Sequence, residues 1–93
     1  VHTIKIENGH PMLARVTGTG CMASALAGAF AGACKGDYLT AAAAAVSAMG
    51  IAGEMAYAKA GNVGTASFRT ALIDALSTLG AQEFAQRSKI DEV

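Results

Sequence analysis

A chain of 93 residues with seven acidic and seven basic residues is long enough for at most one domain. The neutral charge and the scattered lysines and arginines exclude a strong electrostatic attraction to nucleic acid or to an acidic membrane surface, so neither is an expected partner. Hydrophobic residues make up 53% of the chain and charged residues only 15%. We therefore expect more apolar surface than one small domain covers, and burial against a larger body or neighbouring subunits.

Residues 1–16 predict a β-hairpin. Two short apolar runs flank Asn8-Gly9, a dipeptide typical of the two-residue type I′ turn. Pro11 lies just after the turn and places the second strand at a sheet edge or shifts its pairing, because proline has no N–H for the ladder. His10 has no second candidate ligand nearby, so we expect a solvated loop histidine.

A first helix is predicted over about residues 20–33. Its apolar side chains recur every four residues on one stripe, formed by Met22, Leu26 and Phe30. Lys35 in the last turn and Gly36 as a left-handed cap are expected to end it.

A second helix is predicted over residues 38–60, with Asp37 as its N-cap. One face carries small residues that would let another element approach closely, and it consists of Leu39, Val46, Gly50, Gly53 and Tyr57. A third helix follows over about residues 67–79, capped by Thr65 or Ser67. Its apolar stripe is Phe68, Leu72, Ala75, Leu76 and Leu79. The polar tail is expected to hold one short helix, so the elements predict an α/β chain, a hairpin followed by three main helices.

Two charge-free windows, residues 16–34 and 38–53, are rich in alanine and glycine. Both fall short of the roughly 20 strongly apolar residues that a bilayer span requires, so we expect buried helices of a soluble cytoplasmic protein. Cys21 and Cys34 would lie about 20 Å apart along one helix, too far for a disulfide. Free thiols are therefore predicted, as is usual in a reducing compartment.

The segment VTGTGCMASALAGAF places Gly18, Thr19 and Gly20 where the first helix begins. The first amides of a helix have no internal acceptor, and with the helix dipole they form a site for an anion. Glycines let a ligand reach the main chain, and the Thr19 hydroxyl can add a donor. The turn thus predicts an oxyanion pocket suited to a phosphoryl group. The alternative that the glycines only form a turn stays open, and no Lys-Ser/Thr pair follows to make a P-loop.

Cys21 follows this turn directly. The start of a helix favours a thiolate, so Cys21 is a candidate base or polar contact for a substrate hydroxyl. The alternative is a small residue packed in the first turn. No histidine follows in a usable pattern, so a Cys-His nucleophile is not expected.

Three segments in order, ENGHPMLARVTGTGCMASALAGAF, AAAAAVSAMGIAGEMA and SFRTALIDALSTL, resemble the C-terminal third of hydroxyethylthiazole kinases, members of the ribokinase-like superfamily. The resemblance implies that residues 1–93 are the C-terminal part of a single ribokinase-like domain with a three-layer α/β/α fold, its N-terminal portion absent. It also implies a cytoplasmic homotrimer with the active site between subunits.

The implied activity is ATP-dependent, Mg²⁺-assisted phosphorylation of the hydroxyl of 4-methyl-5-(2-hydroxyethyl)thiazole, in thiamine biosynthesis and salvage. By the same resemblance, Gly18 would contact the substrate through its amide, and Gly18, Thr19 and Gly20 would line the anion hole for a phosphate of ATP. Cys21 stands where relatives carry the catalytic base. The Mg²⁺ ligands and part of the ATP site would come from upstream, so no metal ligand is predicted here and the isolated residues are expected to be inactive.

Two alternatives remain open. Many hydroxymethylpyrimidine (phosphate) kinases of the same superfamily also carry a cysteine at this turn, although the downstream SFRTALIDAL favours the thiazole branch. A non-catalytic helical interaction fragment would use the same glycines only as turn formers.

Overall fold

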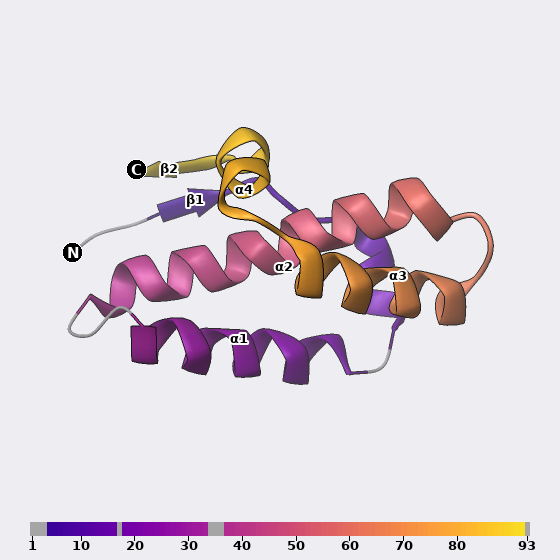
Figure 1. The fold of residues 1–93 in the computed structure, drawn as a ribbon, viewed down its shortest axis with the longest axis horizontal. Coiled ribbons are helices and arrows are strands. Elements are labelled where there is room, and N and C mark those ends of the chain that lie inside the picture. The colour runs from indigo at the N-terminus through magenta and orange to yellow at the C-terminus, as the bar shows by residue number, and fades with distance from the viewer. Residues whose placement is uncertain (1–3, 17, 34–36, 93) are drawn as a thin grey trace.

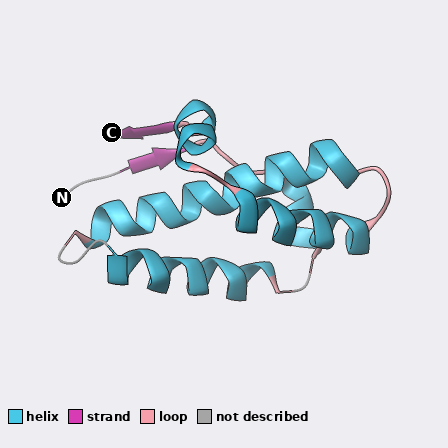
Figure 2. Ribbon diagram, viewed as in Figure 1, coloured by secondary structure: helices cyan, strands magenta, loops and turns pink. Residues whose placement is uncertain are grey.

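The computed structural model describes residues 4–16, 18–33 and 37–92. Helices make up most of the body, and two short strands lie together at one end (Figures 1 and 2). In chain order the elements are β1 (Ile4–Ile6), the 3-10 helix η1 (Pro11–Arg15), α1 (Thr19–Ala33), α2 (Tyr38–Ala60), α3 (Thr65–Thr78), α4 (Ala81–Arg87) and β2 (Ile90–Glu92).

The two strands are the first and last elements of the chain. β1 pairs antiparallel with β2, and Ile6 lies opposite Ile90. The predicted hairpin around Asn8-Gly9 is therefore wrong, because residues 11–15 form η1 instead. Pro11 is the first residue of this helix, a position at which the backbone N–H has no acceptor within the helix, so proline loses no hydrogen bond there.

His10 caps η1 and is not a freely solvated loop residue. Its Nδ1 accepts a hydrogen bond of 3.0 Å from the amide of Met12. Its ring also stacks on Tyr57 of α2, with the ring centroids 3.7 Å apart. The side chain that was expected to be solvated thus fixes the start of η1 and its position against α2.

Asn8 joins three parts of the chain. Its Nδ2 donates to Glu54 Oε2 on α2 at 2.9 Å and to the carbonyl of Arg87 at 2.8 Å. Its Oδ1 accepts from the Ser47 hydroxyl at 3.1 Å and from the Lys89 amide at 2.7 Å. Ser47 is fully buried, so this bond satisfies a hydroxyl that water does not reach. The Asn8 side chain replaces the expected turn with a junction between β1, α2 and the C-terminal segment.

The face of α2 that was predicted to admit a close neighbour does so. A Cβ added to Gly50 would lie 2.7 Å from the carbonyl carbon and oxygen of Asn8, and one added to Gly53 would lie 2.8 Å from Leu13 Cδ1. The larger members of this face, among them Val46 at 54% exposure, are not part of the core. Close packing here depends on the glycines.

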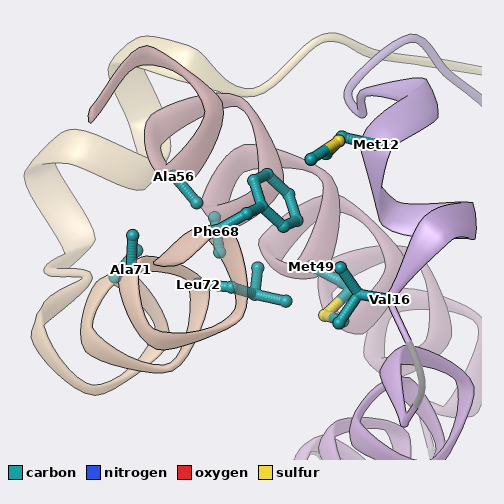
Figure 3. Close-up of a cluster of buried hydrophobic side chains, with 9 residues drawn as sticks. Met12, Val16, Met49, Ala56, Phe68, Ala71 and Leu72 are labelled. Atoms are coloured by element: carbon teal, nitrogen blue, oxygen red, sulfur yellow. The ribbon is translucent and has the colours of Figure 1, made fainter. Parts of the chain in front are cut away.

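The hydrophobic core lies between α2, α3 and η1 (Figure 3). Phe68, Leu72 and Ile51 are the largest fully buried apolar side chains. The predicted stripe on α3 is confirmed for Phe68, Leu72 and Ala75, with Leu76 packed partly against them. The core cluster consists of Met12, Val16, Met49, Ala52, Ala56, Phe68, Ala71, Leu72 and Ala75.

α1 is apolar but has no buried residue. Met22 and Leu26 pack partly against the core, as their stripe predicted, whereas Phe30, the third member of the stripe, is half-buried and lies outside the core cluster. The expectation of a buried helix within residues 16–34 is therefore wrong for this chain. α2, in contrast, is long and apolar enough to span a bilayer, but 56% of that window is buried, as in a core helix.

The other predicted helix ends have mixed outcomes. Asp37 does cap α2, since its Oδ1 accepts from the Thr40 amide at 3.2 Å. Neither Thr65 nor Ser67 caps α3, because the helix begins at Thr65 after Gly64 and has no side-chain cap. Lys35 and Gly36 lie outside the described residues, and the short helix expected in the tail is α4.

We predict that Gly50→Ala lowers the free energy of unfolding by about 2 kcal/mol or more. The new methyl group would meet the backbone of Asn8, and such overpacking outweighs the better helix propensity of alanine. Gly28→Ala in α1 is the control, because its Cβ would meet nothing within 4 Å and should stabilise by up to about 1 kcal/mol. Urea titrations of the two variants test this, and equal midpoints would contradict it.

We also predict that Asn8→Ala costs about 2 kcal/mol, because it removes four hydrogen bonds and leaves the buried Ser47 hydroxyl without its acceptor. Asn62→Ala, at an exposed position after α2, should change stability by less than about 0.5 kcal/mol. Thermal unfolding monitored by circular dichroism measures both. Similar midpoints for the two variants would show that the junction contributes little.

Candidate functional site

The glycine turn at the start of α1 has a conformation that favours glycine. Gly18 has φ +98°, which residues with a Cβ rarely adopt. Its carbonyl accepts from the Met22 amide at 3.0 Å and closes the first turn of the helix. The amides of Thr19, Gly20 and Cys21 precede this bond, and no acceptor for them exists within the described part of the chain. That they hold an anion stays a prediction, and Thr17 lies outside the described residues.

The hydroxyl of Thr19 serves the fold instead. It donates to the carbonyl of Leu13 at 3.0 Å and lies 3.4 Å from the carbonyl of Val16. The expectation that this hydroxyl adds a donor to the anion site is wrong for this structure, because its single hydrogen is directed at η1. Thr19 thereby ties the end of η1 to the start of α1 and sets the position of the turn, while its amide stays at the helix start.

Gly20 is not required by the packing of the chain. A Cβ there would meet no atom within 4 Å, and glycine inside a helix costs about 1 kcal/mol relative to alanine. The alternative that the glycines only form a turn therefore accounts for Gly18, whose φ is positive, but gives no reason for Gly20. A Cβ on Gly28 or Gly32 of the same helix would likewise meet no atom within 4 Å, so free space alone does not mark a ligand site, and close approach of a ligand to the backbone of Gly20 stays a prediction.

Cys21 is exposed and its thiol is free. Its exposure is compatible with a contact to a substrate hydroxyl, and the role of a base stays a prediction. Cys34, the other cysteine, lies outside the described residues.

The turn opens into a hollow of about 330 Å³. It lies at the end of the molecule where α1 and α3 both begin, and Figure 1 shows these two helix starts on the same side. Two arginines lie on its wall, Arg15 from the end of η1 and Arg69 from α3. The full lining is Arg15, Val16, Gly18, Thr65, Ala66 and Arg69. The sequence analysis missed both arginines. Arg15 lies three positions before Gly18, so its closeness in sequence to the turn could have identified it. Arg69 comes to the turn only through the packing of the helices.

A magnesium site is not found in the described ranges. They contain no group of three or more His, Cys, Asp or Glu side chains that could hold a metal ion. The donors at the hollow are amides and guanidinium groups, which suit an anion and not a cation. The residues that line the hollow therefore do not fit Mg²⁺.

We predict that Gly18→Ala destabilises the fold by about 1–2 kcal/mol through its positive φ. A clash is not the cause, because the nearest atom to the new Cβ would be 3.8 Å away. Gly20→Ala is the matched control two residues on, and it should be neutral or slightly stabilising. Thermal unfolding of the two variants measures the difference, and a Gly20→Ala loss as large as that of Gly18→Ala would contradict it.

Comparisons with known proteins agree with one another. A model of the Hydroxyethylthiazole kinase family matches residues 1–82. The chain is 49% identical over 92 residues to the hydroxyethylthiazole kinase of Ruminiclostridium cellulolyticum, covering 99% of this chain and 33% of that protein. It is 50% identical over 88 residues to the hydroxyethylthiazole kinase of Clostridium botulinum (strain Eklund 17B / Type B), covering 95% of this chain and 31% of that protein.

The fold is similar to a solved structure of the hydroxyethylthiazole kinase protein from Pyrococcus horikoshii OT3. The TM-score is 0.86 at 40% identity, over 99% of this chain and 35% of that one. The chain thus spans about a third of the length of the relatives it matches.

Proposed function

Because the chain belongs to the Hydroxyethylthiazole kinase family, we propose that it supplies the phosphate-binding turn of a kinase that phosphorylates 4-methyl-5-(2-hydroxyethyl)thiazole with ATP, a step of thiamine biosynthesis and salvage. The predicted resemblance and fold class are confirmed. Since the chain spans about a third of its relatives, we propose that residues 1–93 form the C-terminal part of one ribokinase-like domain.

The observation that carries the proposed function is the start of α1, where three amides without an acceptor among the described residues follow Gly18.

The proposed reaction transfers the terminal phosphoryl group of ATP. The hydroxyl oxygen of the thiazole alcohol forms a bond to the γ-phosphorus, while the bond from that phosphorus to the bridging oxygen breaks and ADP leaves with the electron pair. The hydroxyl proton passes to a base, for which Cys21 Sγ is the candidate in this chain. The amides of Thr19 and Gly20 donate to the phosphoryl oxygens, and the amide of Gly18 contacts the substrate.

The amides are proposed to contribute more than the thiol. Phosphoryl transfer has a loose transition state and depends mostly on positioning and on stabilising charge. Donors fixed at a helix start provide both without reorganising during the reaction. A general base typically contributes about 10²–10⁴-fold.

Magnesium assistance is part of the proposal, with ligands from outside the described residues, because those residues hold no suitable cluster. For the same reason we expect residues 1–93 alone to have no kinase activity. We further propose a cytoplasmic homotrimer with small-molecule substrates. The exposed apolar side chains Tyr38 and Val63, at 66% and 71% exposure, and the absence of buried residues on α1 support additional contacts of this kind.

Steady-state kinetics of the full-length protein that carries these residues test the activity. With ATP as donor, we expect a higher kcat/KM for the thiazole alcohol than for hydroxymethylpyrimidine. Preference for the pyrimidine would assign the protein to the alternative kinase activity. Turnover of neither alcohol, with ATP and Mg²⁺ present, would favour a non-catalytic role.

We predict that Gly18→Val lowers kcat by about 100-fold or more, because it displaces the amides that stabilise charge, and that Cys21→Ser has a smaller effect. Gly20→Ala should lower turnover about 100-fold by displacing the phosphate although its Cβ fits the fold. Gly28→Ala, in the same helix but away from the turn, is the control. A loss for Cys21→Ser equal to or larger than that for Gly18→Val would refute the ranking.

A further inference from the structure

The Arg69 side chain approaches the glycine turn. It lies one turn into α3, and its Nη2 would be 3.8 Å from a Cβ added to Gly18. The residue is exposed, so the guanidinium group lies at the surface beside the turn, where a ligand can reach it. Gly18 and Arg69 are far apart in sequence and meet because α1 and α3 begin at the same end of the molecule (Figure 1).

The hollow beside the turn is rich in positive charge. Arg15 and Arg69 both lie on its wall, as do the first two residues of α3, Thr65 and Ala66. The first hydrogen bond of α3 runs from the Phe68 amide to the carbonyl of Gly64, so the amides before Phe68 are at the open start of the helix. The N-termini of two helices therefore add their dipoles to two guanidinium groups.

Neither wall arginine forms an ion pair with a carboxylate of the described residues. The ion pairs within ranges 4–16, 18–33 and 37–92 are Lys5 with Glu7 and Arg87 with Glu83, and neither wall arginine takes part. Arginine presents five donors in a planar fork that matches the oxygens of a phosphate. The hollow thus has the charge and the donors to hold a phosphate, and Arg69 has a side-chain nitrogen within 4 Å of the Cβ position of Gly18.

We propose that Arg69 is a phosphate-binding residue of the site, donating from its guanidinium group to a phosphoryl oxygen that the Thr19 and Gly20 amides also hold. This inference rests on the proposed function. The phosphate is either that of the nucleotide or that of the phosphorylated thiazole alcohol, and both share the oxyanion that the guanidinium group recognises. Arg15, which also lines the hollow, supplies charge to the same space.

The test compares Arg69→Gln with Arg87→Gln in the full-length protein. Both variants remove one exposed arginine charge, but Arg87 lies on α4 and pairs with Glu83. We measure the KM for ATP, kcat, and inhibition by the phosphorylated thiazole. Arg69→Gln should raise the KM for ATP about tenfold if the nucleotide phosphate is bound, or weaken product inhibition about tenfold if the product phosphate is bound.

Arg69→Lys separates charge from geometry. It should recover part of the loss, because lysine keeps the charge without the planar fork. Unchanged thermal midpoints for the Arg69 variants are expected because the side chain is exposed, and they exclude unfolding as the cause. The inference would be overturned if Arg69→Gln and Arg87→Gln had the same KM for ATP and the same product inhibition.

Failure of the proposed function can be distinguished from failure of the inference about Arg69. If the unmodified protein does not phosphorylate the thiazole alcohol, the proposed function fails, and calorimetric titrations with ATP and with the phosphorylated thiazole then test Arg69 directly. Binding of either compound about tenfold weaker in Arg69→Gln than in Arg87→Gln would support the inference, and equal binding of both would overturn it.

Discussion

The structure depends on the close contact between Asn8 and α2. Gly50 lets the backbone of Asn8 approach to a distance that any Cβ would prevent, and at this separation the Asn8 side chain reaches Ser47 and Glu54. The contact positions the segment that follows, so η1 lies over Gly53 and adds Met12 to the core. The Thr19 hydroxyl then bonds to the end of η1 and places the glycine turn. A chain of contacts thus connects a buried glycine in the middle of α2 to the candidate site.

The candidate site combines local and distant contributions. The amides at the start of α1 follow from helix geometry and from Gly18, and they would be present in an isolated helix. The two arginines are brought in by packing, Arg15 through η1 and Arg69 through α3. An anion at the turn would therefore contact groups from three elements, and its affinity would depend on how well η1 and α3 are held against α2.

The predictions from sequence succeeded where the interactions are local. The bounds of α2 are the predicted ones, because Asp37 caps it and alanine favours the helix throughout. The hairpin failed because the Asn8 side chain bonds to partners 39 and 81 positions away, which a turn propensity does not take into account. The role of the Thr19 hydroxyl failed for a related reason, since its acceptor is a carbonyl of η1, and η1 itself was not predicted.

The pairing of β1 with β2 has a consequence for how the protein folds during synthesis. β1 is synthesised before the helices that follow it but gains its strand partner only after residues 90–92 emerge, and Asn8 meets the Lys89 amide only at that same late stage. Until then α1, α2 and α3 can associate, while the edge of β1 stays open to pairing with other chains. Nascent chains truncated before residue 88 should consequently be the most dependent on chaperones.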